Sequence, residues 1–471
     1  MYNIRFIRKL ILRTLFITIF FSALHAKNLD KFDKASFIAN YFSGLILLND
    51  NQYSKSYSFL KKLEGLENSH PGYSIKYLHS LVNLGRFNEA FHYSKKLEKI
   101  ERNDYESDLI IGIYYLKEKN YFLANKYFNN LKSYKDKSLL DDFIINSLSN
   151  WVNFNSLSLA EAKKRVDLID PKFENLKRIQ NTFLHCYYKS TKTAFYFEDL
   201  TSNDTIDFSR YNYFHAKYLS NKSKYDEAKM IIDSSLKLYP RNLLLNQLKL
   251  DLINKKYRNE FNCENLSDVI AEIFYISANA LSSQKLYKFS NFYLNLAKFL
   301  NKNFYSFDAL LAENFFKINN FEKAKKIYTD LGRHGEAFHW YSAKQNAKIL
   351  IEEKKDEKAL KLIKNTFEKL SKKDIYETYD FARFLKNNDQ FEEAINAYTS
   401  IINKINENHP LYPDVKDGRG VAYERIGEWK KAEKDLLASL KASPNQAYVI
   451  NYLAYSWIEQ GVKIEKSLKM L

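Results

Sequence analysis

The chain has little of the two residues that most often interrupt helices. Its 471 residues include only 6 prolines and 11 glycines, well below the average usage in globular proteins. A chain of this length would ordinarily form two to four domains joined by polar linkers. No glycine-, serine- or proline-rich stretch occurs in the sequence. This excludes flexible linkers between domains and favours one continuous helical array.

The sequence also lacks the motifs of the common enzyme classes. There is no nucleophile elbow, P-loop, glycine-rich dinucleotide turn or HExxH sequence. His334 and His339 are five residues apart with few acids beside them, so we interpret them as turn and helix residues rather than metal ligands. We therefore predict a protein that is not an enzyme and that binds no cofactor, metal or small-molecule substrate.

The basic charge of the chain invites a nucleic-acid interpretation. The formal net charge is +17, and clustered lysines and arginines bind phosphates. Four of these charges fall in residues 1–26, which contain no acid, so +13 remains for the rest. That remainder is spread over mixed-sign segments such as residues 351–358 (IEEKKDEK), which are typical of solvated helix faces. Nucleic-acid binding is therefore an alternative and not the first hypothesis.

The first 26 residues, MYNIRFIRKLILRTLFITIFFSALHA, have the pattern of an export signal. A basic opening precedes an apolar run from Thr14 to Leu24, and Ala26 offers a cleavage residue. The run would span roughly half of a bilayer core at about 1.5 Å per residue. We predict export to the periplasm of a Gram-negative bacterium, with a mature start near Lys27. An uncleaved membrane anchor is the alternative.

Residues 413–446, PDVKDGRGVAYERIGEWKKAEKDLLASLKASPNQ, form the clearest unit of the chain. The pattern predicts two antiparallel helices, with Gly427 in the turn between them and Trp429 at the start of the second. Gly420 and Ala432 have little bulk, so the helices can approach closely where they cross. Pro444 ends the second helix because it has no amide hydrogen.

This unit resembles a tetratricopeptide repeat (TPR). Counted from Pro413, four residues fall at family positions 8, 11, 20 and 32: Gly420, Tyr423, Ala432 and Pro444. Lys416 and Arg419 depart from the pattern, because the family often has tryptophan and leucine there. The resemblance implies an all-α solenoid of roughly 12–13 stacked antiparallel helix pairs, some degenerate, in a TPR superhelix. The run NYLAYSW near the C-terminus resembles exported TPR proteins of Gram-negative bacteria.

The template recurs along the chain. A small residue at position 20, preceded three residues earlier by an aromatic, occurs at Ala90, Ala124, Ala228, Ala324 and Ala394. Looser matches are Ser56, Ser290, Ala359 and Ser467, and the remaining gaps are filled by Ala162, Ala194 and Glu260. The mean spacing of these markers is about 34 residues. Five prolines lie at the expected junctions: Pro71, Pro171, Pro240, Pro413 and Pro444.

The repeats differ in quality, which divides the chain into four parts. We predict a signal peptide at 1–26, N-terminal TPR-like repeats at 27–149, degenerate helical hairpins at 150–282 with one good repeat at 209–242, and a C-terminal array at 283–471 with an incomplete last repeat. The degenerate part keeps the helical period of apolar residues but loses the small markers. Helical hairpins are expected there too, with irregular stacking.

Cys186 and Cys263 are the only cysteines, 77 positions apart. They fall in different repeats, and in a solenoid each repeat touches mainly its neighbours. We therefore predict two buried thiols and no disulfide.

A candidate binding surface follows from the repeat register. In TPR proteins, side chains at positions 2, 5, 9, 12 and 13 face the groove. Two consecutive copies carry an aromatic and basic strip there: Tyr341, Lys344, Lys348, Tyr376, Tyr379, Arg383 and Lys386. Such residues would suit an extended acidic peptide. The alternative is a solvated face in a chain rich in tyrosine and lysine. The copy at 413–446 has an acidic set instead, which lacks the residues that hold a C-terminal carboxylate in chaperone-binding relatives.

Together these features predict a non-enzymatic, periplasmic scaffold that binds a protein or an extended peptide. Two alternatives remain open. The chain could be a basic helical-repeat protein that binds nucleic acid, or an auxiliary module of a cell-wall (peptidoglycan) enzyme. Membrane contact is expected only through an uncleaved signal anchor.

Overall fold

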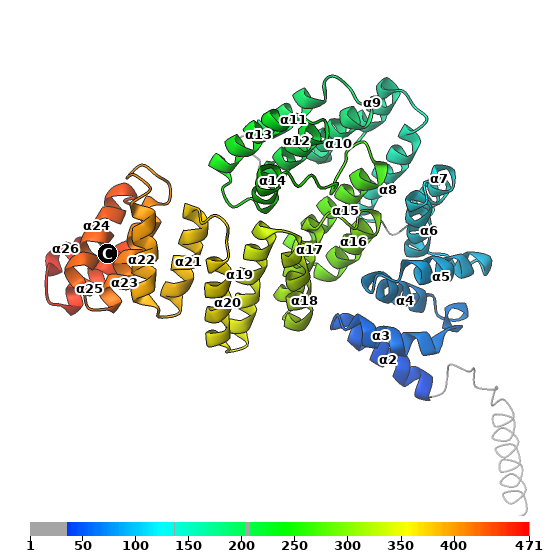
Figure 1. Cartoon of the computed structure of the whole chain (residues 1–471). Coiled ribbons are helices and arrows are strands. Elements are labelled where there is room, and N and C mark those ends of the chain that lie inside the picture. Colours follow the sequence, from blue (N-terminus) through cyan, green and yellow to red (C-terminus); the bar gives the residue numbers. More distant parts are fainter. Residues whose placement is uncertain (1–34, 136, 203–207, 471) are drawn as a thin grey trace, which may run out of the picture. The chain divides into compact units, whose positions relative to one another are not determined.

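The computed structural model describes residues 35–135, 137–202 and 208–470 (Figure 1). The predicted signal peptide at 1–26 lies outside them. Within these ranges the regular elements are all helices, with no strand. The fold is an α-solenoid of stacked antiparallel helix pairs, which confirms the predicted all-α class.

The helices form two compact units whose segments alternate along the chain. In the described residues, the first unit contains residues up to 196 and 260–307, and the second contains 197–259 and 308–470. This grouping follows contacts in space, whereas the four parts expected above followed repeat quality along the sequence.

The helices of the first unit are α2 (Ala35–Asn49), α3 (Tyr53–Leu60), α4 (Pro71–Asn83), α5 (Phe87–Lys99), α6 (Tyr105–Lys117), α7 (Tyr121–Asn130), α8 (Leu139–Phe154), α9 (Leu159–Asp167), α10 (Glu174–Tyr187), α15 (Leu266–Ser283) and α16 (Tyr287–Leu300). Two helices, α11 (Thr193–Thr201) and α17 (Ser306–Lys317), begin in the first unit and end in the second. The second unit also contains α12 (Ser209–Asn221), α13 (Tyr225–Leu238), α14 (Leu243–Ile253), α18 (Phe321–Leu331), α19 (Glu336–Glu352), α20 (Asp356–Glu368), α21 (Ile375–Asn387), α22 (Phe391–Ile402), α23 (Tyr412–Arg425), α24 (Trp429–Ala442), α25 (Ala447–Glu459) and α26 (Ile464–Met470).

The pair α23–α24 shows how one repeat closes. A Cβ added to Gly420 would lie 2.9 Å from Leu436 Cγ and 3.3 Å from the carbonyl oxygen of Ala432. Ala432 is itself fully buried, so both small residues sit where the helices cross. Gly427 has φ +80° and ends the first helix. The predicted helix pair is thus confirmed.

The small markers of the other repeats occupy the same structural place. Each of the following lies in the second helix of a pair and has no exposed surface: Ser56, Ala90, Ala124, Ala162, Ala228, Ser290, Ala324, Ala359, Ala394, Ala432 and Ser467. Ala194 is only half-buried, and Thr193 beside it is fully buried instead. Glu260 was a wrong choice: it lies in the non-helical segment between α14 and α15, so α14 has no second helix.

A left-handed residue closes the turn inside nearly every pair. Five residues before each marker, φ lies between +53° and +80° at Asn51, Gly85, Lys119, Lys189, Ser223, Lys285, Asn319, Lys354, Asp389 and Gly427. The next amide then reaches back across the helix end, as Lys355 N–H does to the carbonyl of Leu350 at 2.7 Å. Only Gly427 was predicted; eight of the other nine are not glycine, so the sequence did not mark them as turn residues.

The two residues that depart from the TPR pattern form a buried ionic cluster. Asp435 is 2% exposed. It accepts hydrogen bonds from Lys416 Nζ at 2.8 Å and from Arg419 Nε at 2.6 Å. The guanidinium of Arg419 also donates to Thr399 Oγ1 at 2.9 Å, which links α23 to α22. Polar pairing therefore replaces the apolar contacts of the usual tryptophan and leucine, and removing one partner would leave a buried charge without compensation.

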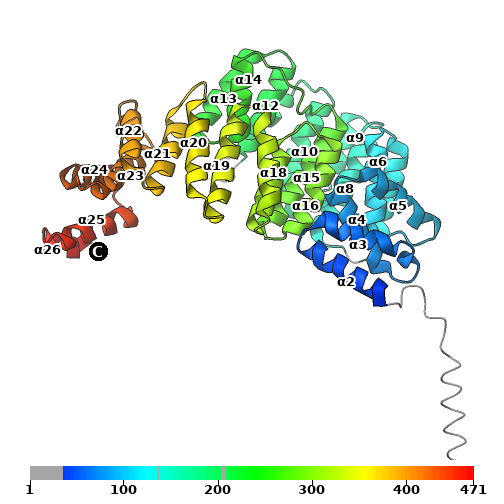
Figure 2. The same ribbon diagram turned by 60° about the horizontal axis from the view of Figure 1, so that its bottom comes forward.

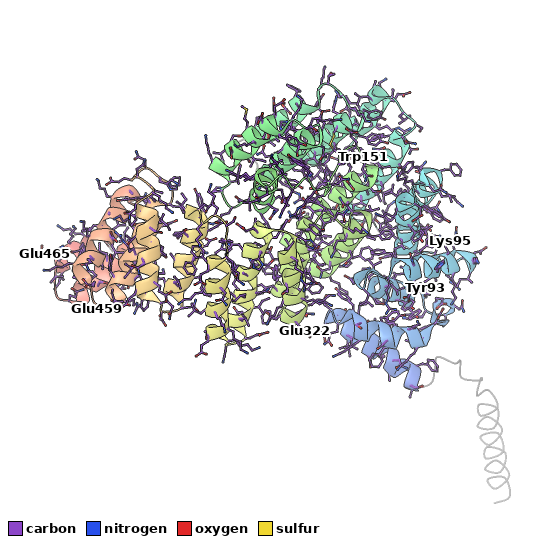
Figure 3. The ribbon with its side chains drawn as sticks, viewed as in Figure 1. Tyr93, Lys95, Trp151, Glu322, Glu459 and Glu465 are labelled. Carbon is purple, nitrogen blue, oxygen red and sulfur yellow. A yellow bond between two sulfur atoms is a disulfide. The ribbon has the colours of Figure 1, made fainter. Side chains whose placement is uncertain are left out.

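The degenerate stretch is also held by buried polar contacts. Trp151 of α8 is fully buried, and its indole N–H donates to Gln180 Oε1 of α10 at 3.0 Å (Figure 3). Gln180 in turn donates to Ser147 Oγ at 2.9 Å. These polar contacts join α8 to α10.

In the first unit, α15 and α16 return to pack on helices far earlier in the chain (Figures 1 and 2). The ring of Phe292 in α16 stacks on His79 of α4, with 4.4 Å between centroids. Phe299 stacks on Phe87 of α5 at 4.2 Å. Lys117 Nζ of α6 donates to the carbonyl of Leu300 at 2.7 Å. The repeats of this unit therefore do not contact only their sequence neighbours.

This return corrects the prediction for the cysteines. Cys186, at the end of α10, and Cys263, just before α15, form a disulfide with their Cα atoms 5.8 Å apart. The prediction of two separate buried thiols was wrong because it assumed contacts between neighbouring repeats alone. The bond joins the places where the chain leaves the first unit and returns to it, 77 positions apart.

We predict that reduction of Cys186–Cys263 destabilises the first unit. The cross-link closes a long loop, and loss of a native disulfide typically costs about 2–5 kcal/mol. Thermal unfolding with and without dithiothreitol should show a lower midpoint after reduction, and Cys186→Ala/Cys263→Ala should be insensitive to the reductant. Alkylation of both thiols in denatured, unreduced protein would show that the bond does not form.

We also predict that Lys354→Gly stabilises the α19–α20 pair. Lys354 has φ +58°, a conformation that costs an L-residue roughly 1–2 kcal/mol. Part of that gain is lost to the greater freedom of glycine in the unfolded chain, so the net increase in unfolding free energy should be about 0.5–1 kcal/mol by urea denaturation. Lys358→Gly, at an exposed position of α20, is the matched control and should cost about 1 kcal/mol. A loss of stability in Lys354→Gly would contradict the argument.

Candidate functional site

The predicted strip lies along two first helices of the second unit. Tyr341, Lys344 and Lys348 are on α19, and Tyr376, Tyr379, Arg383 and Lys386 are on α21. A cleft of about 610 Å³ opens between α19, α20 and α21. Lys344, Lys348 and Arg383 line it, so three of the seven predicted residues share one cleft.

The tyrosines of the strip are more buried than the register suggested. Tyr379 is 9% exposed and packs in the core formed with Ala382 and Tyr398. Tyr341 is half-buried, with its ring edge-to-face against Tyr328 at 6.0 Å. Tyr376 is also half-buried. These rings therefore contribute mainly to packing, and the accessible part of the strip is basic rather than aromatic.

Two residues that the sequence did not indicate stand within the strip. Asp380 pairs with Lys344 Nζ at 2.5 Å and with Arg241 at 3.0 Å. Arg241 comes from the α13–α14 turn, and its guanidinium lies over the rings of Tyr376 and Tyr379 at 5.5 and 5.6 Å. Burial acts to raise the pKa of Asp380, but the charges of Lys344 and Arg241 outweigh it and lower the pKa. Asp380 lies between two groove positions, and Arg241 is 139 positions distant, so neither was found.

Three cations of the strip remain unpaired. Among the described residues, Lys348, Arg383 and Lys386 have no ion pair or side-chain hydrogen bond. Partial desolvation lowers the pKa of Lys348, and the charges of Lys344 and Arg383 lower it further. An anionic group placed among them would relieve this repulsion.

A buried indole adds an unused donor to the wall of the cleft. Trp340 is 4% exposed and lines the cleft, yet its Nε1 has no hydrogen-bond partner in the part of the chain that the structure describes. The other buried indoles are satisfied: Trp151 bonds to Gln180, and Trp457 to Glu433 at 2.6 Å. Leaving a buried N–H unpaired costs roughly 1–3 kcal/mol.

The cleft also has an apolar wall and an acidic end. Leu360 and Ile363 of α20 and Phe384 of α21 supply the apolar surface. Asp356 begins α20 and Asp389 lies in the α21–α22 turn, so the carboxylates gather where the helix pairs turn. Asp380, by contrast, lines the cleft beside the cation of Lys344.

Groove positions in the first unit are in contact with the chain itself. By the repeat register, His79, Asn83 and Lys117 hold positions 9, 13 and 13 of their copies. All three meet α16: His79 stacks on Phe292, Asn83 Oδ1 accepts a hydrogen bond from Asn295 at 3.2 Å, and Lys117 bonds to Leu300. The comparable positions on α21 of the second unit include the unpaired Arg383 and Lys386.

Glu377, on the side of α21 that bears Asp374 and Asp380, has a strongly raised pKa. Its carboxylate accepts the backbone N–H of Asp374 at 3.2 Å. Burial raises its pKa to about 7, with Asp374 and Glu336 adding to the rise and Lys344 opposing it. The side chain lines a smaller pocket together with Arg241, Tyr341 and Lys344, so its charge affects the same strip.

The described ranges contain neither a metal-binding cluster nor a membrane-spanning helix. No group of three or more histidine, cysteine, aspartate or glutamate side chains is arranged to hold a metal there, and no helix there is long and apolar enough to span a membrane. His339 is exposed, and the backbone carbonyl of His334 accepts a hydrogen bond from Arg258.

No protein-family model and no curated protein matches the chain. Similar solved structures include the Cut9–Hcn1 hetero-tetramer of APC/C, with 16% identity and a TM-score of 0.34 over 92% of this chain and 86% of that chain. YrrB, described as a TPR protein with an unusual peptide-binding site, has 19% identity and a TM-score of 0.29 over 40% and 92%. The TPR domain of P58(IPK) has 11% identity and a TM-score of 0.25 over 92% and 97%. We transfer no function from these similarities.

We predict that Glu377 makes stability fall as pH rises toward neutrality. Its folded pKa of about 7 lies above its unfolded value, so the folded state holds an extra proton between roughly pH 4.5 and 7. Ionisation of the buried carboxyl therefore lowers the free energy of unfolding by its full amount above pH 7 and not at all below about pH 4.5. Glu377→Gln should raise the unfolding free energy at pH 8 by about 1–3 kcal/mol and change it little at pH 4.5.

The matched control is Glu392→Gln, an exposed position on the neighbouring α22. It should have the same small effect at both pH values in thermal unfolding. An equal effect of Glu377→Gln at pH 4.5 and pH 8 would show that its carboxyl is not perturbed.

Proposed function

We propose that the chain is a non-enzymatic TPR-type scaffold of the bacterial periplasm and cell envelope. It binds an extended segment of a partner protein in the cleft between α19, α20 and α21. The observation that carries the proposal is the presence of two cations, Lys348 and Arg383, that are unpaired among the described residues, in a cleft with an apolar wall.

The cleft specifies the chemistry of its ligand. Carboxylates would pair with Lys348 and Arg383, which both line the cleft, and these charge-assisted bonds are stronger than neutral ones. An apolar side chain would cover Leu360 and Phe384. An extended peptide suits this site because it can present a carboxylate to the cations and an apolar side chain to the apolar wall at the same time. The proposed ligand is therefore an acidic segment with one apolar anchor.

Two features support the proposed location. Residues 1–26 have the basic opening, apolar run and small final residue of an export signal. The disulfide Cys186–Cys263 is a second feature, since such bonds persist in the periplasm and are rare in the cytosol. The scaffold would then meet partners that are exported as well.

Site-specific cross-linking in the producing cells tests the binding cleft. Benzoylphenylalanine at Asn387, an exposed residue that lines the cleft, should capture a protein partner on irradiation, and Lys348→Glu/Arg383→Glu should lower the yield at least tenfold because the charges that attract the ligand are reversed. The matched control is Lys361→Glu/Lys369→Glu, at an exposed position of α20 and at the exposed residue that caps its C-terminus, which should leave the yield within twofold. Fractionation of the same cells should place the chain in the periplasm.

Three other outcomes of these experiments would contradict the proposal. Capture that is equal in both charge variants would show that the partner does not use this cleft. A product that nuclease destroys would favour the basic nucleic-acid alternative. Recovery in the cytosol alone would refute the proposed location.

A further inference from the structure

A second cleft lies in the first unit, apart from the site proposed above. It has a volume of about 650 Å³ and is formed by α8, the end of α9 and the short 3₁₀ helix η5 (Pro171–Phe173). Its lining is neither purely apolar nor dominated by one charge. The positions of its polar groups indicate the chemical class of its ligand.

The apolar part of this cleft has a buried floor and an exposed rim. Phe143 is 4% exposed, and its ring packs against that of Phe173 with 5.3 Å between centroids. On the rim, Leu139 is 60% exposed and Leu168 is 84% exposed. Two exposed leucines beside an aromatic floor form a seat for one large apolar side chain.

One wall of the cleft presents free amide groups. Asn146 and Asn150 are on α8, one helical turn apart, and both line the cleft. Neither side chain has a hydrogen bond to any residue that the structure describes. Four residues of helix advance about 6 Å, close to the roughly 6.6–6.8 Å that two residues of an extended peptide span. Each amide has a donor and an acceptor, so the pair can bond successive peptide groups on one side of such a strand.

Two carboxylates and one guanidinium line the cleft. Asp142 lies 4.0 Å from Lys137, and Asp170 accepts the backbone N–H of Lys172 at 2.9 Å. Arg165, which also lines the cleft, has no carboxylate within ion-pair distance across residues 35–135, 137–202 and 208–470. A ligand carboxylate would therefore find a guanidinium that is not already paired.

We propose that this cleft binds an extended peptide segment with a large aliphatic or aromatic side chain beside an acidic residue. The apolar side chain rests on Phe143 and against Leu168, the backbone bonds to Asn146 and Asn150, and the carboxylate pairs with Arg165. The site is independent of the α19–α21 cleft, so the chain has two separate peptide sites, one in each unit.

Selection from a phage-displayed random dodecapeptide library on the purified chain tests this proposal. The selected peptides should carry a large apolar residue next to aspartate or glutamate. In binding assays with synthetic copies, Asn146→Ala/Asn150→Ala/Leu168→Ser should weaken affinity at least tenfold. Leu168→Ser alone should weaken it several-fold, and because this side chain is so exposed, the single variant is expected to keep its fold.

A matched control carries the same kinds of change elsewhere in the first unit. Phe122 is 83% exposed on α7, and Asn88 is exposed on α5, so Phe122→Ser/Asn88→Ala should leave affinity within twofold. Arg165→Gln should weaken the affinity for an acidic peptide at least fivefold. It should not change the affinity for the same peptide with its acidic residue replaced by the corresponding amide. Lys163→Gln, on an exposed face of α9, is its control.

The outcomes separate this site from the proposed function. Peptides whose binding is lost in Lys348→Glu/Arg383→Glu but kept in the Asn146, Asn150 and Leu168 variant belong to the α19–α21 cleft, and if all selected peptides behave so, the present proposal is overturned. The proposal is also overturned if no peptide is enriched, or if the selected peptides bind the variants of this cleft as tightly as they bind the matched controls.

Discussion

Every regular repeat in this protein depends on one close helix crossing. A small residue such as Ala432 is fully buried against its partner helix, and a left-handed residue five positions earlier reverses the chain. The two constraints act together, because a turn of fixed length brings the small residue to the crossing only when the helices are in one register. Repetition of this unit accounts for a solenoid with few glycines and prolines, since each turn needs one left-handed residue and not a flexible loop.

Contacts beyond neighbouring repeats give the first unit its individual character. The pair α15–α16 packs on α4, α5, α6 and α8, and the disulfide Cys186–Cys263 ties its approach to the end of α10. Groove positions such as His79 and Lys117 are used in these contacts. A surface that could have received a partner is thus part of the protein's own packing, and the accessible polar groups of this unit lie instead at the α8–α9 cleft.

The charges divide into those that the fold uses and those that it leaves free. Asp435 holds Lys416 and Arg419 in the interior, and Asp380 holds Lys344 and Arg241. Lys348, Arg383 and Lys386 have no such partner within the described residues. Buried pairs of this kind add little net stability compared with apolar contacts, so their effect is to set geometry. The unpaired cations, by contrast, are available to an anionic group from outside the chain.

The sequence by itself determined the helix pairs, their period and most of the buried small markers, because these depend on residues within one repeat of each other. It placed Lys344 on the predicted strip but not its partners Asp380 and Arg241, and it misjudged Cys186 and Cys263. Only the tertiary structure decided those contacts, together with the Asn146 and Arg165 cleft. They join residues from non-neighbouring helices, up to 139 positions apart, and a local helical pattern contains no information on which distant helices will meet.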